Sequence, residues 1–186
     1  MRSSWIKFWM LVAVCAVNGW AEAPEEAPKA RTGPRLHGFG PVFDVPEPDF
    51  VTGTERDYRA VFDVARAPDE PDRVNPSIET LARFLNMHKR AGVPDERIHV
   101  ALVLHGSAAK AALEDDAYRK RHNVDNPNQE LLQALRAAGV RIVLCGQSAA
   151  SRGFERAELA APVELALSAM TALITLQSDG YELIAF

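Results

Sequence analysis

Cysteine is scarce in this chain: only two of its 186 residues are cysteines. Cys15 lies inside an apolar run at 8–17, and the other cysteine is Cys145. Arg2 and Lys7 come before or at the start of that run, a pattern typical of a secretory signal peptide that would carry Cys15 away when it is cleaved. The mature chain then has one cysteine and no internal disulfide, so we ask what a lone thiol does in an oxidising compartment.

Long hydrophobic runs are also missing. The run at 8–17 is shorter than the roughly 20 apolar residues that span a bilayer, so we expect cleavage and no stable membrane insertion afterwards. The small residues Ala21 and Ala23 mark two cleavage sites, and we favour Ala21 because a cut after Ala23 would leave Pro24 as the new N-terminus. The mature protein is therefore expected in the periplasm or outside the cell.

Positive charge is in deficit, with 21 Lys and Arg against 25 Asp and Glu and a net charge of −4. Removal of residues 1–21 takes away two basic residues and no acidic ones, which leaves about −6. No basic stripe interleaved with aromatic residues is present, so nucleic acid is not an expected partner. The histidines show no metal-ligand spacing, and neither a metal nor another cofactor is expected. A nucleophilic serine elbow and paired carboxylates are also absent.

Proline and glycine gather in one stretch, 22–56, which has little hydrophobic periodicity. This composition predicts an extended arm rather than a second domain. Its apolar side chains either lie on the body of the protein or on a neighbouring subunit, and a flexible tether is the alternative. The apolar side chains concerned are Phe39, Val42, Phe43 and Val45.

The remaining stretch, 57–186, has the length of one domain and alternates between strand and helix patterns. Repeated strand–helix–strand units predict an α/β fold, with a mostly parallel sheet sandwiched by helices. For the helix at 126–138 we expect Asn126 as N-cap, Pro127 in the first turn and Gln129 closing a capping box. Strands are expected at 59–65, 98–104, 140–144, 163–167 and 181–186, and helices at 75–91, 108–113, 126–138 and 168–180.

Two reactive side chains follow buried strands of this sheet. Reactive groups gather at the carboxyl ends of parallel strands, and His105 and Cys145 are both expected there. Cys145 is either a reactive thiol, favoured by the helix N-terminus that follows it, or a buried structural cysteine. His105 is either a group that hydrogen-bonds or deprotonates this thiol, or a core or capping histidine.

Four neighbours of these residues complete the candidate site. Arg152 lowers the pKa of the thiol if its loop folds back, and is otherwise a surface arginine. Gly146 and Gln147 offer backbone N–H groups to a sulfur or an anion, although Gly146 also suits a tight turn. Gly106 begins a loop with some likeness to an anion-binding loop, well short of a P-loop.

Short motifs spread over 57–186 occur together in a known family. In chain order, the motifs are Val103-Leu104-His105-Gly106, Asn126-Pro127-Asn128 with Leu131 and Leu135, Ala138-Gly139-Val140, Cys145-Gly146-Gln147, Ser168-Ala169-Met170-Thr171 and Leu176-Gln177 before Gly180-Tyr181. With this set of motifs the domain resembles the DsrE/DsrF-like family, and within it the exported members of mostly unassigned role.

The resemblance implies a three-layer α/β/α sandwich with a mostly parallel five-stranded sheet. The second and third strands would lie side by side in it, so that His105 and Cys145 share one edge of the sheet. It also implies homo-oligomers, as trimers or dimers of trimers. In the sulfur-relay members, a cysteine that matches Cys145 takes up sulfur as a persulfide and passes it to a partner protein. Such chemistry suits a thiolate and needs no cofactor.

Three functions are therefore compared. The leading hypothesis is an exported sulfur-binding or sulfur-relay protein, a sulfurtransferase-like carrier in which Cys145 holds the sulfur, His105 and Arg152 tune it, and a donor or acceptor protein is its partner. The alternative is a non-catalytic oligomeric module that binds a small ligand or serves assembly, with an inert cysteine. Thiol–disulfide exchange is the third, and it would need a mixed disulfide with another chain.

Overall fold

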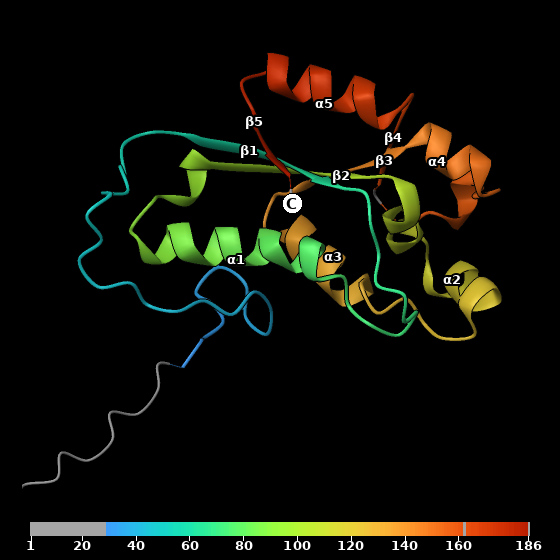
Figure 1. Cartoon of the computed structure of the whole chain (residues 1–186), viewed down its shortest axis with the longest axis horizontal. Coiled ribbons are helices and arrows are strands. Elements are labelled where there is room, and N and C mark those ends of the chain that lie inside the picture. Colours follow the sequence, from blue (N-terminus) through green and yellow to red (C-terminus); the bar gives the residue numbers. More distant parts are fainter. Residues whose placement is uncertain (1–28, 162, 186) are drawn as a thin grey trace, which may run out of the picture.

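A five-stranded sheet forms the centre of the molecule (Figure 1). The computed structural model describes residues 29–161 and 163–185, so the predicted signal peptide at 1–21 lies outside the described residues. The strand order is β4-β3-β2-β1-β5, and every pairing is parallel. The strands are β1 (Tyr58–Val64), β2 (Ile98–Leu104), β3 (Arg141–Cys145), β4 (Glu164–Ala166) and β5 (Glu182–Ala185).

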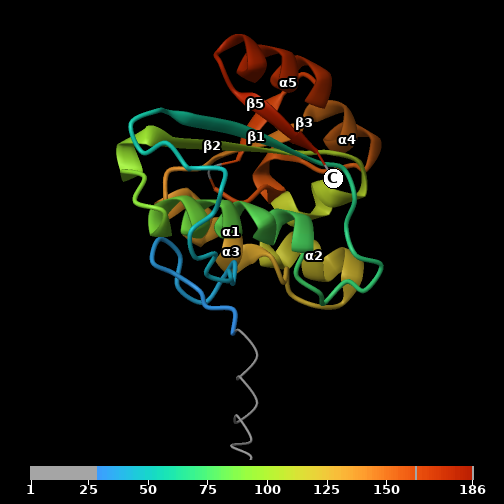
Figure 2. The ribbon, with the colours of Figure 1, turned by 60° about the vertical axis from the view of Figure 1, so that its left-hand side comes forward.

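Helices cover the two faces of this sheet unequally. In both ribbon views, α1 and α3 lie along one face and α5 lies on the other (Figures 1 and 2). The described part of the chain contains no helix long and apolar enough to cross a membrane. The helices are α1 (Pro76–Arg90), α2 (Asp115–His122), α3 (Gln129–Ala137), α4 (Gly146–Ser151) and α5 (Ala169–Ser178), with 3-10 turns η1 (Asp95–Arg97), η2 (Gly106–Ala112) and η3 (Arg156–Glu158).

Side chains on the central strands alternate between the two faces. Phe62 and Leu104 pack in the larger core with α1 and α3, whereas Val61 and Val103 pack in the smaller core under α5. Both kinds are fully buried, which explains why these strands read as nearly continuous apolar runs. The alternation also decides which side chains at the strand ends face α5.

The predicted α/β sandwich is confirmed, and the sheet is parallel throughout the described residues. Two helix starts were also predicted correctly. The side chain of Asn75 accepts a hydrogen bond from Ser77 N at the start of α1, and that of Ser168 accepts one from Thr171 N at the start of α5.

The predicted start of the third helix was wrong. The helix begins at Gln129 with Asn128 as its N-cap, and Asn126 lies outside it. The buried Asn126 amide instead donates to the carbonyl oxygens of Ala111 and Leu113, and its side-chain oxygen accepts from Asn128 N. The Asn126 amide nitrogen therefore satisfies the backbone where η2 ends, and its oxygen bonds Asn128 N, which lies ahead of the helix rather than within it.

The arm packs against α1 on the face of the sheet away from α5. Leu36 and Val42 are buried and Phe39 packs on the larger core, whereas Phe43 and Val45 stay exposed. The fully buried Asn86 side chain on α1 holds this segment. It accepts from Arg35 N and Leu36 N and donates to the carbonyl oxygens of Leu36, Phe39 and Gly40.

Arg90, in the last turn of α1, makes a second attachment to the arm. Its guanidinium donates to the carbonyl oxygens of Arg31, Thr32 and Gly33 and pairs with Asp44 at 3.1 Å. The Gly40 backbone also lies directly against α1, since a Cβ at this position would be 2.3 Å from Arg83 N. Residues 31–44 of the arm are thus attached to the body.

Replacement of Asn86 tests how much this docking contributes to stability. We expect Asn86→Ala to lower the free energy of unfolding by about 3 kcal/mol, because several buried backbone groups lose their partner and each costs about 1–3 kcal/mol. Chemical denaturation measures the change, and limited proteolysis should then cut the arm first. Gln133→Ala, at an exposed position of α3, is the control. Equal stability of both variants would show that the arm is held by other contacts.

Candidate functional site

Cys145 lies at the carboxyl end of β3, where β2 ends beside it. Leu104 pairs with Leu144 in the β2–β3 register, so the next residues in the two chains are His105 and Cys145. The backbone stays extended through both. Neighbouring strands are roughly 5 Å apart, which brings the two residues into the same neighbourhood. Cys145 belongs to the core under α5, and by alternation from Leu104 the His105 side chain is on that same face.

The Cys145 sulfur lies where two helices begin. The Ser148 hydroxyl and the backbone N–H groups of Gln147 and Ser148, at the start of α4, lie beside the sulfur and lower the pKa of the thiol. A further N–H group comes from Ala169, the first residue of α5. The first N–H groups of a helix have no partner within the helix and carry partial positive charge, so both helix starts favour a negative sulfur.

Burial and hydrogen bonding act in opposite directions on this thiol. Cys145 is only 5 % exposed, and its burial raises its pKa. The polar N–H and hydroxyl groups of Ser148, Ala169 and Gln147 lower the pKa by more, so that it lies below the ordinary value of a cysteine. Since the thiolate is the nucleophilic form of cysteine, the site favours the reactive species while covering it.

His105 is paired with a carboxylate. Its Nε2 lies 2.8 Å from Oδ1 of Asp63, near the carboxyl end of β1, and both side chains are about a quarter exposed. Within the described residues Nδ1 of His105 has no hydrogen-bond partner. Three adjacent strands therefore present Asp63, His105 and Cys145 on the α5 side of one sheet edge.

Two glycines allow the backbone to close around this edge. A Cβ on Gly146 would lie 2.5 Å from the carbonyl oxygen of Ala166, and one on Gly106 would lie 2.4 Å from that of Ala65. Gly106 also has φ of +53°, which other residues rarely adopt. Its N–H donates to the Ser148 hydroxyl at 3.1 Å, so Ser148 links the end of β2 to the thiol.

The other expected site residues lie further from the sulfur. Gln147 contributes its backbone N–H, but its exposed side chain donates to the carbonyl oxygen of Leu167 at 3.4 Å. Arg152 is exposed at the end of α4, with its guanidinium 3.4 Å from Ser151 Oγ. It is not among the largest causes that lower the pKa of Cys145. The structure thus brings together His105, Gly106, Gly146 and the Gln147 backbone around the thiol, and leaves Arg152 at the surface.

Sequence reasoning missed Ser148 and Asp63. Ser148 contacts Gly106, which is 42 residues away in the chain. Asp63 contacts His105, which is also 42 residues away. A signal for Asp63 was available, because it is the one charged side chain inside the apolar run Ala60–Val64. Ser148 had only the weak signal of a hydroxyl three residues after the cysteine.

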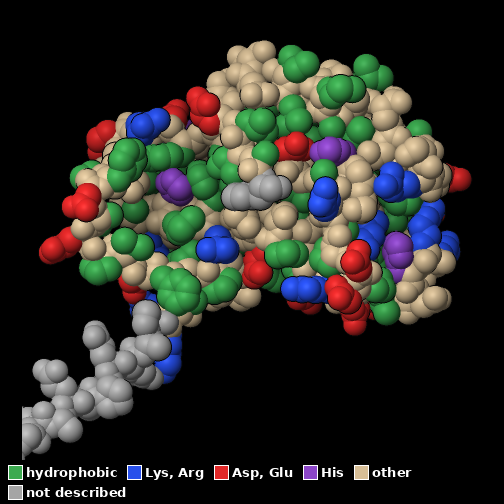
Figure 3. Space-filling view, in the orientation of Figure 1, with side chains coloured by type: hydrophobic (Ala, Val, Ile, Leu, Met, Phe, Trp, Pro, Cys, Tyr) green, Lys and Arg blue, Asp and Glu red, His purple; other side chains and the backbone are tan. Residues whose placement is uncertain are grey.

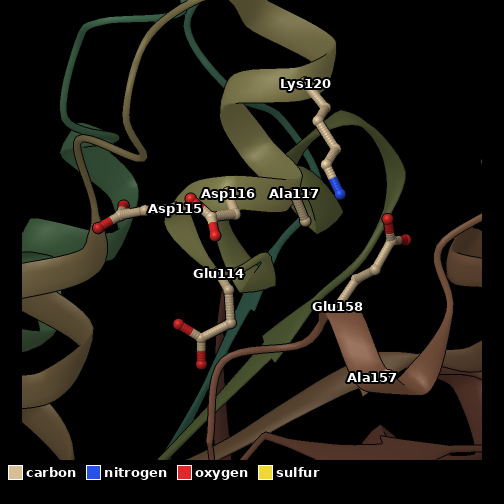
Figure 4. Close-up of a pocket in the computed structure, with 7 residues that line it drawn as sticks. All are labelled: Glu114, Asp115, Asp116, Ala117, Lys120, Ala157 and Glu158. Carbon is tan, nitrogen blue, oxygen red and sulfur yellow. The ribbon is translucent and has the colours of Figure 1, made fainter.

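A separate pocket of about 480 Å³ lies between α2 and η3 (Figure 4). Its carboxylates already have partners: Glu114 accepts from Ala161 N, Asp116 pairs with Arg119, and Glu158 pairs with Arg121. Across 29–161 and 163–185, no group of three or more His, Cys, Asp or Glu side chains is placed to hold a metal ion. We therefore assign the pocket to no ligand.

Comparison with family models decides the relationship, because the model of the DsrE/DsrF-like family matches residues 59–186. The chain belongs to the DsrE/DsrF-like family. No protein with a curated description matches it. All the expected site residues lie within the DsrE/DsrF-like part.

Two solved structures share the fold of this DsrE/DsrF-like domain. One is a protein of unknown function, MTH1491, from Methanobacterium thermoautotrophicum, at 20% identity and a TM-score of 0.53, covering 70% of this chain and 100% of that one. The other is the ychN protein of E. coli, at 20% identity and a TM-score of 0.50, covering 69% of this chain and 99% of that one. At this identity the likeness concerns the fold alone.

The Ser148 hydroxyl gives a direct test of the thiol environment. We expect Ser148→Ala to raise the pKa of Cys145, because a hydrogen bond that favours the thiolate is lost. The iodoacetamide alkylation rate of the native protein, followed across pH, should then fall at least several-fold at neutral pH and have its midpoint at higher pH. Ser151→Ala, exposed on the same helix, is the control and should leave the profile unchanged. An unshifted profile for Ser148→Ala would contradict this account.

Proposed function

We propose that this protein carries sulfane sulfur as a persulfide on Cys145, outside the cytoplasm. The observation that supports it most is the covered thiol between the starts of α4 and α5, with a lowered pKa. Membership of the DsrE/DsrF-like family supports it further, because sulfur relay occurs within that family. The signal peptide pattern at 1–21 supports export.

The chemistry needs a nucleophile and a protected place for the product. The Cys145 thiolate attacks the outer sulfur of a sulfane donor, the sulfur–sulfur bond of the donor breaks, and Cys145 holds the new sulfur. A persulfide is an acid whose anion needs the same hydrogen-bond donors as a thiolate. The backbone N–H groups of Gln147, Ser148 and Ala169 already converge on this point. Low exposure of Cys145 slows the reaction of the product with other thiols and oxidants.

Intact mass spectrometry tests the carrier role. Incubation of the mature protein with a persulfide donor should add about 32 Da, and a reducing thiol should remove it. Cys145→Ser should abolish the addition. Cys145→Ser combined with Ser151→Cys moves the thiol to the exposed end of α4 and should load more slowly. A wild-type protein that stays unmodified, or equal loading at position 151, would overturn the proposal.

We also propose that the protein is a homo-oligomer assembled through the α5 face. Three apolar side chains there are largely exposed: Leu167 at 73%, Met170 at 73% and Ile174 at 65%. Figure 3 shows hydrophobic side chains at the surface above the sheet, over α5. Met170 and Ile174 are four residues apart and so lie on one side of the helix. A second copy that presents the same apolar face is the occupant that this surface suits.

The oligomer has its own test. We expect Met170→Glu with Ile174→Glu to convert the assembly to monomer, because two carboxylates in an apolar interface lose their hydration without gaining a partner. Light scattering coupled to size exclusion measures the mass. Met87→Glu, exposed on α1, is the control and should leave the assembly intact. A monomeric wild-type protein would contradict this proposal.

A further inference from the structure

The His105–Asp63 pair lies where the persulfide chemistry proposed for Cys145 needs a proton donor. A thiolate that takes sulfur from a donor R–S–SH releases R–S⁻, and an alkyl thiolate is a basic leaving group. A proton given to that sulfur as the bond breaks lowers the barrier. The site therefore needs a proton donor beside Cys145, and His105 is the titratable side chain that the register brings there.

Asp63 fixes which nitrogen of His105 can act. The 2.8 Å contact joins Asp63 Oδ1 to Nε2 of His105. The proton of a neutral imidazole therefore stays on Nε2, which donates a hydrogen bond to the carboxylate. Nδ1 is then the nitrogen that takes up and gives away the mobile proton.

We propose that Asp63 is a positioning residue that holds His105 as the proton donor to the leaving thiolate of an alkyl persulfide, the class of sulfur donor that this site takes. The proposal rests on the persulfide chemistry above. The step is Cys145–S⁻ plus R–S–SH plus His105–H⁺, giving Cys145–S–SH, R–SH and neutral His105. The outer sulfur of the donor bonds to Cys145, and the electron pair of the broken bond leaves on R–S⁻. The proton that the Cys145 thiol loses on ionising replaces the one that His105 gives.

Thiosulfate fits this edge less well. It is a double anion and would approach the carboxylate of Asp63, which is a quarter exposed. Its leaving group is sulfite, which departs without an added proton and so gains nothing from His105. The His105–Asp63 pair therefore favours alkyl persulfides over thiosulfate.

Loading kinetics on the full mature protein test the proposal. With glutathione persulfide as donor, we expect His105→Gln to slow the 32 Da addition about a hundredfold and Asp63→Asn about tenfold, within the usual range for lost acid catalysis. Iodoacetamide alkylation should change little in both variants, because iodide leaves without a proton and the thiol keeps its hydrogen bonds. Unchanged alkylation also shows that the variants are folded.

The matched controls lie at the other end of the same strand. His99, near the start of β2, lies 3.8 Å from Asp57, so His99→Gln and Asp57→Asn remove a histidine and a nearby carboxylate far from Cys145. Both should load at the wild-type rate. A readout independent of loading is the imidazole ¹⁵N spectrum, which should show the His105 proton on Nε2 in the wild type and a mixture of tautomers in Asp63→Asn.

The outcomes separate the two proposals. If wild-type protein gains no sulfur from any donor, the carrier function fails. If it loads while His105→Gln and Asp63→Asn load equally fast, the role of the pair is wrong and the carrier function stands. Faster loading from thiosulfate than from glutathione persulfide, or a wild-type spectrum with the proton on Nδ1, would also overturn this inference.

Discussion

The parallel pairing of β1, β2 and β3 is the constraint on which the site depends. In a parallel sheet, all strands end at one edge, and the register sets which residues are neighbours there. Leu104 opposite Leu144 places His105 beside Cys145, and Asp63 is within reach on the next strand. A slip of one residue in β2 would turn the His105 side chain toward α1 and α3. The fully buried side chains on both faces make such a slip costly, so packing far from the edge holds these side chains on one side.

The surroundings of Cys145 combine two properties that usually oppose each other. A buried thiol is ordinarily a poor nucleophile, because removal from water disfavours its charged form. Here the backbone supplies the missing solvation through N–H groups of α4 and α5, and Ser148 adds its hydroxyl. Backbone donors are fixed by the helices and lose no side-chain entropy when they bind the anion. The protein therefore keeps the anion stable without opening the site to bulk water.

The sequence predicted the features that depend on local patterns. The run Ile98–Leu104 is apolar and uninterrupted, and the strand has those bounds. Asn75 and Ser168 precede helices as their chemistry suggests. Asn126 had equally good local chemistry for a cap, but the helix begins at Gln129, and the Asn126 amide donates to the carbonyl groups of Ala111 and Leu113. Local pattern alone cannot register such competition, because the competing partners come from another element.

The candidate site was predicted in part for the same reason. Cys145 and His105 follow apolar runs and could be assigned to the sheet edge, whereas Ser148 and Asp63 act through contacts across 42 residues of chain. Arg152 shows the opposite error. Its closeness to Cys145 in the sequence suggested an influence on the thiol, but Arg152 follows the end of α4 and its guanidinium lies at the surface. Strand register and helix direction decide which side chains contact a functional group, and both depend on the assembly of the whole sheet.

The anchored arm determines from which side the described chain emerges. Residues 31–42 are fixed to α1 by Asn86 and Arg90, under the sheet face opposite α5 (Figure 2). The outer side of this arm is therefore separate from Cys145 and the apolar helix above it. A partner that binds residues 31–42 can do so without covering the thiol.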